Sequence, residues 1–266
     1  MIKKIRTSTL LKMKAEGEKI TALTAYDYTF AYLLDQSGIE IILVGDSCGM
    51  VCAGYETTIP VTIDEMMYHL KSVKRGVKRA LLVLDMPFMS YQESIEKALH
   101  NAGRFMKEGE AEAVKIEGGE HICPTISKLV ENGIPVMGHL GLTPQSVHEF
   151  GGYGIRGSDR GEAEKLKNDA LAIQGAGVFS IVLEKIPSGL ASEITESLNV
   201  PTVGIAAGPN CDGQILVSYD MLGLYDKVNL KFVRKYADLA GDIREAVEIY
   251  CGDIKSGKFP TDKESF

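Results

Sequence analysis

Acidic side chains recur at the ends of short hydrophobic segments in this sequence, and these are the residues best suited to chemistry. Segments rich in Val, Ile and Leu run directly into Asp46, Asp85, Glu117 and Glu184, and another such segment contains His139. A carboxylate at the rim of a low-dielectric core is costly unless a cation or hydrogen-bond donors compensate for it. If these segments converge, three or four carboxylates at one place require a divalent cation.

The side-chain types indicate which ion such a site would hold. Carboxylate oxygens without a cysteine or histidine pair favour Mg2+ in octahedral geometry, with water and substrate completing the shell. Cys48 and Cys52 lie near Asp46, but no second pair matches their spacing. We therefore interpret them as loop or buried thiols rather than as zinc ligands.

Each of these residues also has a structural interpretation when it is taken alone. Asp46 and Asp85 suit turns or helix caps, and Glu117 could pair with Lys115, because residues two apart on a strand share a face. His139 could be a core histidine whose hydrogen bonds are satisfied. Only convergence on one rim favours function over structure.

The hydrophobic segments themselves predict the fold. Eight β-branched runs bounded by Gly, Pro or Asp alternate with stretches of helical spacing. We expect strands at residues 20–25, 40–45, 80–86, 113–118, 134–140, 178–184, 200–205 and 215–218. Eight such units in 266 residues favour a closed parallel (β/α)8 TIM barrel, as a single domain over residues 1–266, rather than an open doubly wound sheet. The chemistry of such barrels gathers at the carboxyl ends of the strands, where the acids lie.

Several helix signals accompany the strands. Thr62 with Glu65 and Ser90 with Glu93 fit the capping box, and Asp27 is suited to cap a helix that begins at Tyr28. We also expect one helix before the first strand and a C-terminal helix over about residues 231–250.

A long glycine-rich loop follows the fifth predicted strand. Residues 141–161 contain six glycines and no convincing periodicity, and a loop of this length in a compact domain is usually functional, often a lid. The G-x-G-x-x-G pattern at residues 152–157 does not directly link a strand to a helix. We therefore do not interpret it as a dinucleotide-binding fingerprint.

Composition excludes several classes of function. The formal net charge of −7 argues against nucleic acid as a partner, and the 45% of hydrophobic residues is typical of a globular protein with a full core. The longest apolar stretches have about five residues, far short of the ~18 that span a membrane, and no hydrophobic export signal follows the basic start of the chain. Five scattered cysteines without a C-x-x-C pair favour a reducing compartment, so we expect a cytoplasmic protein.

Ordered motifs along the chain resemble those of the ketopantoate hydroxymethyltransferase family. The resemblance runs from about residue 4 to the tail at residues 258–260. The motifs are Thr24-Ala25-Tyr26-Asp27, Gly45-Asp46-Ser47, Pro60-Val61-Thr62, Asp64-Glu65-Met66, Asp85-Met86-Pro87-Phe88, Lys115-Ile116-Glu117-Gly118-Gly119, Gly138-His139-Leu140-Gly141-Leu142-Thr143-Pro144-Gln145, Leu183-Glu184 and Cys211-Asp212-Gly213-Gln214.

The resemblance implies a barrel of the phosphoenolpyruvate/pyruvate superfamily type in a large homo-oligomer, a homodecamer built as a pentamer of dimers. It implies transfer of a hydroxymethyl group from 5,10-methylenetetrahydrofolate to 3-methyl-2-oxobutanoate, with Mg2+ as cofactor. The product would be ketopantoate, in the first step of the pathway to pantothenate and coenzyme A. The expected partners are thus small molecules and further copies of the chain, without nucleic acid or membrane.

The resemblance also implies roles for individual residues. Asp46 and Asp85 would bind Mg2+ and thereby contribute to substrate binding, and Glu117 would lie near the metal directly or through water. The substrate itself would meet Ser47, Lys115 and His139, with Glu184 as the general base that removes the proton from C3.

Two other functions are compatible with part of this interpretation of the sequence. A Mg2+-dependent C–C lyase of the isocitrate-lyase kind would also act on a 2-oxo acid, but the Lys-Lys-Cys-Gly-His-like loop that would favour it does not occur in the sequence. A non-catalytic metabolite sensor would bind a keto acid without turnover.

Overall fold

The structure is a computed structural model that describes residues 3–266. The contacts within the chain divide it into two units, Met1–Val217 and Ser218–Phe266. The barrel lies entirely within the first unit. A single domain over residues 1–266 stays a prediction.

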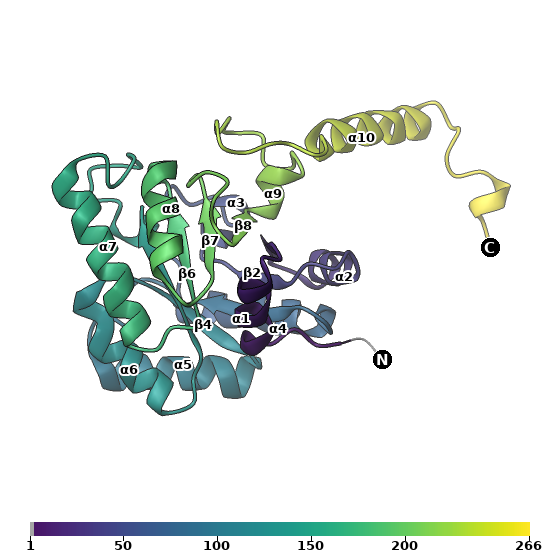
Figure 1. Cartoon of the computed structure of the whole chain (residues 1–266). Coiled ribbons are helices and arrows are strands. Elements are labelled where there is room, and N and C mark those ends of the chain that lie inside the picture. Colours follow the sequence, from purple (N-terminus) through teal and green to yellow (C-terminus); the bar gives the residue numbers. More distant parts are fainter. Residues whose placement is uncertain (1–2) are drawn as a thin grey trace. The chain divides into compact units, whose positions relative to one another are not determined.

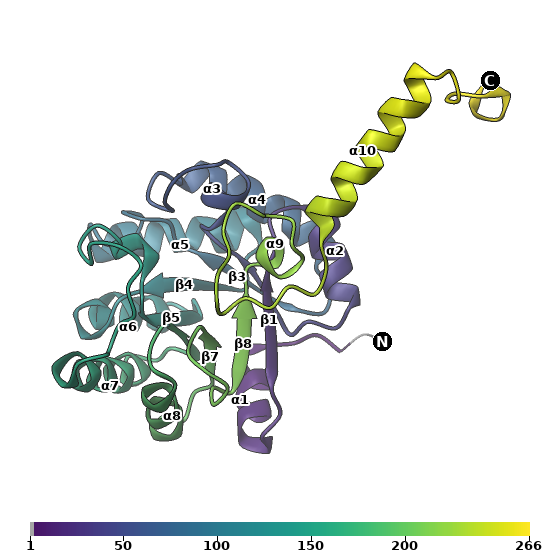
Figure 2. The ribbon, with the colours of Figure 1, turned by 90° about the horizontal axis from the view of Figure 1, so that it is seen from above.

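Eight parallel strands in the described part of the chain close into a barrel in sequence order, which confirms the predicted (β/α)8 fold (Figures 1 and 2). Each strand pairs with the next, and β8 pairs with β1. The strands are β1 Ile20–Thr24, β2 Ile41–Val44, β3 Leu81–Asp85, β4 Ala113–Glu117, β5 Val136–Gly141, β6 Ser180–Glu184, β7 Thr202–Ile205 and β8 Gly213–Leu216.

Helices follow most of the strands and pack around the barrel, whereas β7 leads to β8 through a loop (Figure 2). Those of the first unit are α1 Thr7–Glu16, α2 Tyr28–Gln36, α3 Cys48–Val51, α4 Ile63–Gly76, α5 Ile95–Gly109, α6 Cys123–Glu131, α7 Arg160–Gly175 and α8 Ser188–Ser197, with 3-10 turns η1 Glu120–Ile122 and η2 Pro144–Ser146. The second unit contains α9 Ser218–Met221, α10 Leu239–Lys255 and η3 Asp262–Glu264.

The amino-terminal half of the barrel interior is apolar. Alternate residues of the strands, such as Ile41, Val83 and Met137, form one buried cluster, and Leu10 of α1 joins it. Because side chains alternate between the two faces of a strand, the next residue of the same parity on each strand also faces the interior. The fold therefore directs specific side chains into the carboxyl-terminal half.

Local signals set the helix starts, with one correction. Asp27 caps α2 and the Thr62–Glu65 capping box opens α4, as predicted. The capping box predicted at Ser90 is wrong, because Ser90 lies in a turn, with its N–H bonded to the Pro87 carbonyl oxygen, and α5 begins after Ser94.

The C-terminal helix also differs from its prediction. It spans Leu239–Lys255 rather than residues 231–250. The Asp238 side chain accepts a hydrogen bond from the Gly241 N–H, which fixes the helix start.

Candidate active site

Strand parity brings five predicted site residues together at the carboxyl end of the barrel. Each of them lies an even number of positions from a core residue of its own strand, so its side chain faces the barrel interior. They are Asp85, Lys115, Glu117, His139 and Glu184. The registers pair Asp85 with Lys115 and Glu117 with His139 across neighbouring strands. Residues far apart in the sequence therefore meet at one mouth.

One side of the site lies at the carboxyl ends of β2, β3 and β4 and contains Asp46, Asp85 and Lys115. The Asp46 backbone N–H donates to Asp85 Oδ2 at 3.2 Å, and Lys115 Nζ lies 2.5 Å from Asp85 Oδ1. All three residues are buried. Lys115 thus forms its ion pair with Asp85 rather than with Glu117.

His139 lies between two carboxylates. Its Nδ1 is 3.3 Å from Glu117 Oε1, and its Nε2 is 3.2 Å from Glu184 Oε2. The Glu184 side chain is 18% exposed, against 5% for Glu117, so Glu184 is the acid that a molecule at the mouth can reach. The core-histidine interpretation is therefore incomplete, because this histidine contacts the predicted base.

Ser47 lies at the edge of the same group. Its hydroxyl is 2.9 Å from the Tyr26 hydroxyl. Burial raises the pKa of Tyr26 well above its usual value, so this phenol stays neutral. Ser47 is half-buried, which leaves it accessible from the mouth.

The electrostatics of the site reflect excess negative charge. Burial, together with the charges of Asp85 and Glu117, raises the pKa of Asp46 to about 8. Burial and Lys115 lower the pKa of His139, but the hydrogen bonds with Glu117 and Glu184 outweigh them and raise it to about 9. These contacts with the two carboxylates favour the protonated form of the imidazole.

The carboxylate oxygens at the mouth are suitable ligands for a hard divalent cation, although they are not arranged around a single coordination centre. Residues 3–266 contain no group of three or more His, Cys, Asp or Glu side chains arranged to hold a metal as they stand. Asp85 Oδ1 is nevertheless buried at the mouth, with the Lys115 ammonium as its contact at 2.5 Å. When all four carboxylates are ionised they face only two cations, Lys115 and His139, so one divalent ion would balance the charge.

Two buried residues of the site have no predicted role. Gln145, in η2, donates from its side-chain amide to Asp46 Oδ2 at 3.0 Å, and Tyr91 bonds to both Gln145 and the Glu117 backbone. Gln145 ends one of the motifs quoted above, but a neutral amide carries no charge signal. Nothing in the local sequence indicates its contact with Asp46.

The predicted glycine-rich loop lies between β5 and α7 and is attached beside Glu184. The Arg156 N–H donates to the Lys185 carbonyl oxygen at 3.0 Å, and Lys185 Nζ donates to the Tyr153 carbonyl oxygen. Partial burial and the charges of Asp46 and Glu184 raise the pKa of the Tyr153 phenol, so this loop residue responds to the acids of the mouth.

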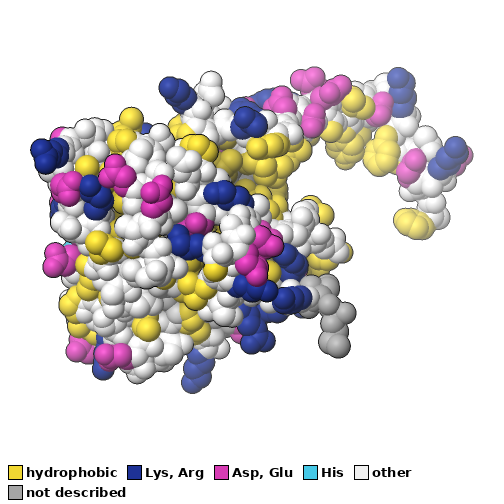
Figure 3. All heavy atoms as spheres, in the orientation of Figure 1, with side chains coloured by type: hydrophobic (Ala, Val, Ile, Leu, Met, Phe, Trp, Pro, Cys, Tyr) yellow, Lys and Arg dark blue, Asp and Glu magenta, His cyan; other side chains and the backbone are white. Residues whose placement is uncertain are grey.

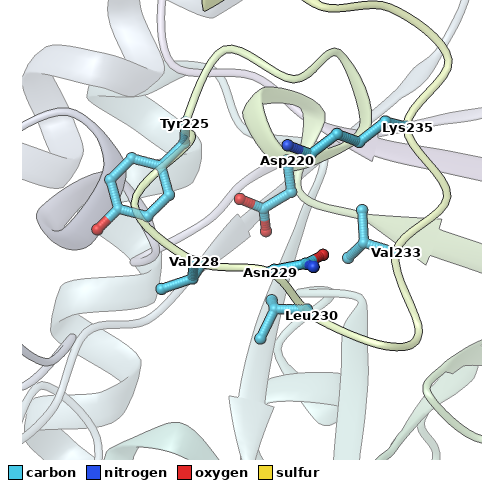
Figure 4. Close-up of a pocket in the computed structure, with 7 residues that line it drawn as sticks. All are labelled: Asp220, Tyr225, Val228, Asn229, Leu230, Val233 and Lys235. Atoms are coloured by element: carbon cyan, nitrogen blue, oxygen red, sulfur yellow. The ribbon is translucent and has the colours of Figure 1, made fainter.

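The described residues also contain a small pocket in the second unit, away from the predicted site residues in sequence (Figure 4). It is lined by residues between 220 and 235, among them Asp220, Tyr225 and Lys235. Burial raises the pKa of Asp220 to about 6, and Lys235 opposes this shift. No residue predicted to do chemistry lines this pocket.

Surface charge and helix length are two further properties of the described residues. Acidic and basic side chains are interspersed on the face shown in Figure 3, without one extended basic region there. Among the described residues, every helix is too short or too polar to cross a bilayer.

Comparison with known proteins gives strong sequence matches. The family model described as ketopantoate hydroxymethyltransferase matches residues 4–262. A 3-methyl-2-oxobutanoate hydroxymethyltransferase of Syntrophotalea carbinolica is 56% identical over 255 residues, which cover 96% of each chain. The protein of the same name from Carboxydothermus hydrogenoformans is 54% identical, over 99% of this chain and 95% of its own.

Solved structures share the fold at low sequence identity. A phosphonopyruvate hydrolase in complex with oxalate and Mg2+ superposes with a TM-score of 0.63 at 12% identity, covering 98% of this chain and 93% of its own. A 2,3-dimethylmalate lyase of the PEP mutase/isocitrate lyase superfamily gives 0.61 at 15% identity, over 98% and 91%. These matches show that the chain shares its barrel fold with those proteins.

The raised pKa of Asp46 predicts how stability depends on pH in metal-free protein. Between about pH 4 and pH 8 the folded state binds a proton at Asp46 that the unfolded state releases, so stability falls as pH rises through this window. Asp46→Asn, which is neutral throughout, should therefore unfold at higher urea concentration than wild type at pH 8 in EDTA. The difference should shrink towards pH 4.

Glu18→Gln serves as the control, because it removes an exposed carboxylate from the same unit. It should leave the urea midpoint nearly unchanged at both pH values. A wild-type protein that is more stable than Asp46→Asn at pH 8 without metal would contradict the interpretation.

Proposed function

Because the chain belongs to the ketopantoate hydroxymethyltransferase family, we propose that it transfers a one-carbon unit from 5,10-methylenetetrahydrofolate to 3-methyl-2-oxobutanoate. With one water, the products are 2-dehydropantoate (ketopantoate) and tetrahydrofolate, and the reaction is the first step towards pantothenate and coenzyme A. The observation that carries the proposal is the meeting of Glu184 with Asp46, Asp85, Lys115 and His139 at one barrel mouth.

Mg2+ is the cofactor that these side chains suit. Asp46 and Asp85 would hold it, and Glu117, whose oxygens contact His139 and the Gln145 N–H, would contribute through water. When bound, Mg2+ supplies Lewis-acid polarisation of the keto oxygen and a fixed orientation for the 2-oxo acid.

The chain's own residues complete substrate binding. Lys115 places a positive charge beside the carboxylates, where the keto acid brings further negative charge. The Ser47 hydroxyl, oriented by Tyr26, offers a hydrogen bond to the substrate carboxylate. His139 lines the pocket between them and Glu184.

Glu184 acts as the general base. Its carboxylate is the most accessible of those at the mouth, and the His139 Nε2 lies 3.2 Å from its Oε2. It takes the proton from C3 of the keto acid, which leaves a nucleophilic carbon and negative charge on the keto oxygen. The one water cleaves both C–N bonds of the folate methylene, which releases tetrahydrofolate and leaves the one-carbon unit as formaldehyde. The C3 carbon then adds to the formaldehyde carbon, and the resulting alkoxide takes up the proton that Glu184 removed, which gives the hydroxymethyl group. The loop held by Lys185 excludes further water meanwhile.

The isocitrate-lyase-like alternative is not favoured. The lyase among the solved structures shares only 15% identity, which speaks for the fold alone, whereas the relatives above 50% identity are named hydroxymethyltransferases. We place the reaction in the cytoplasm, since all five cysteines are free thiols, as a reducing compartment requires.

We also propose that the chain forms a homo-oligomer, a decamer built from five dimers. An apolar stripe on α10, made of Ile243, Val247, Tyr250 and Ile254, supports association. These residues recur at helical spacing and are each about half exposed, and Figure 3 shows apolar side chains along this helix.

The activity itself is the first test. Purified protein supplied with 3-methyl-2-oxobutanoate, 5,10-methylenetetrahydrofolate and Mg2+ should form ketopantoate, measured by mass spectrometry. EDTA should abolish product formation and added Mg2+ should restore it, because the Asp46–Asp85 site needs the ion. Absence of ketopantoate under all these conditions would contradict the proposed function.

Glu184→Gln tests the general base separately. In D2O with Mg2+ and without folate, wild type should exchange the C3 proton of 3-methyl-2-oxobutanoate, as followed by NMR. The variant should lose about 10²- to 10⁴-fold in rate while still binding the keto acid. Glu149→Gln, an exposed acid on the neighbouring loop, is the control and should exchange normally. Unchanged exchange in Glu184→Gln would remove Glu184 from this role.

Light scattering after size exclusion tests assembly. Wild type should elute with ten times the 28.9 kDa mass of one chain. Val247→Glu, in the middle of the stripe, should shift the distribution to smaller species, because it buries a charge in an apolar contact. Glu245→Lys, on the opposite side of α10, should not. A wild-type monomer would contradict the proposal.

A further inference from the structure

Gln145 occupies a central place among the carboxylates, although it carries no charge. The residue lies in η2, immediately after β5, and its side chain is buried. Its contacts come from the carboxyl ends of three other strands, at Asp46 after β2, Met86 after β3 and Glu117 of β4. One residue therefore connects the segments that present the acids.

The amide nitrogen of Gln145 has two acceptors. Nε2 donates to Asp46 Oδ2 at 3.0 Å and to the Met86 carbonyl oxygen at 2.9 Å. A carbonyl oxygen and an ionised carboxylate can only accept hydrogen bonds. If the amide were flipped, its oxygen would therefore face two acceptors. The chemistry of the neighbours thus fixes the orientation of the amide.

The amide oxygen has two donors. Oε1 accepts from the Tyr91 hydroxyl at 2.9 Å and from Gln92 Nε2 at 3.1 Å. The Tyr91 hydroxyl in turn accepts from the Glu117 N–H at 3.1 Å, and the Gln145 N–H donates to Glu117 Oε2 at 3.0 Å. Asp46 and Glu117 are therefore held by one connected hydrogen-bond network.

We propose that Gln145 is a positioning residue that, together with Tyr91, prepares Asp46 and Glu117 for the divalent cation. It binds Oδ2 of Asp46 and leaves Oδ1 for the ion, and it fixes the Glu117 carboxylate beside His139. This inference rests on the proposed function only in taking the ion to be held by Asp46. Hydrogen-bond partners of metal ligands typically change metal affinity 10- to 100-fold when they are removed.

A purely structural role predicts a different outcome. A core residue that only fills space would, when replaced, lower stability and leave the affinity for Mg2+ in the folded protein unchanged. A residue that orients a ligand would weaken Mg2+ binding even where the fold is intact. Metal affinity therefore separates the two roles.

The experiment measures Mg2+ binding by isothermal titration calorimetry on the full chain without substrate. Gln145→Met keeps the length of the side chain and the backbone N–H but removes both amide donors. We expect its Kd for Mg2+ to rise by about 10- to 100-fold. In a titration of activity with Mg2+, the variant's kcat at saturating Mg2+ should approach that of wild type. Its activation constant for Mg2+ should stay raised.

Gln92→Met is the matched control. Gln92 also bonds to Gln145 Oε1, but it is exposed and does not touch Asp46, so water can replace its amide. Its Kd should stay within about twofold of wild type. Tyr91→Phe, which removes one hydroxyl from the network, should weaken Mg2+ binding in the same direction as Gln145→Met, by a smaller factor.

Folded Gln145→Met protein with a wild-type Kd for Mg2+ would overturn the inference. If that variant does not fold by circular dichroism, Tyr91→Phe decides the question: a wild-type Kd overturns the inference and a raised Kd supports it. A wild-type protein that binds no Mg2+ also overturns it. Wild type that binds Mg2+ but forms no ketopantoate refutes the proposed function, while the comparison of affinities still decides the role of Gln145.

Discussion

Excess negative charge, buried at the carboxyl end of the barrel, is the constraint on which the rest of the site depends. Asp46, Asp85, Glu117 and Glu184 gather around only two cationic side chains, and burial with neighbouring charge raises the pKa of Asp46 to about 8. Such an arrangement costs folding free energy in the absence of a further cation. It is the expected form of a site that is completed by a divalent ion and an anionic substrate.

The barrel makes this concentration of charge possible because strand parity separates two regions of one interior. Val83 and Asp85 lie on the same face of β3, and Met137 and His139 on the same face of β5. The residues nearer the amino ends of the strands, such as Val83 and Met137, form an apolar core. Those at the carboxyl ends, such as Asp85 and His139, form the site. The rigidity of the strands, rather than contacts among the acids, therefore holds like charges close together.

Much of this arrangement can be predicted from the sequence, because a hydrophobic segment that stops on a carboxylate is a local signal. Glu184 at the end of β6 is such a case, and the eight strands follow from the same patterns. The specific roles come from the family resemblance instead. The start of α5 is mispredicted because Ser90 fits a capping pattern but lies in a turn, and Gln145 escapes notice because its partners lie on three different strand ends.

Anomalous diffraction from crystals grown with Mn2+ tests the central claim most directly, because Mn2+ occupies oxygen-donor sites of the same kind as Mg2+ and can be located by its own scattering. The account predicts one strong anomalous peak at the barrel mouth, in ligand contact with the carboxylates of both Asp46 and Asp85. A mouth without such a peak at saturating Mn2+, or a peak that contacts neither aspartate, would contradict it.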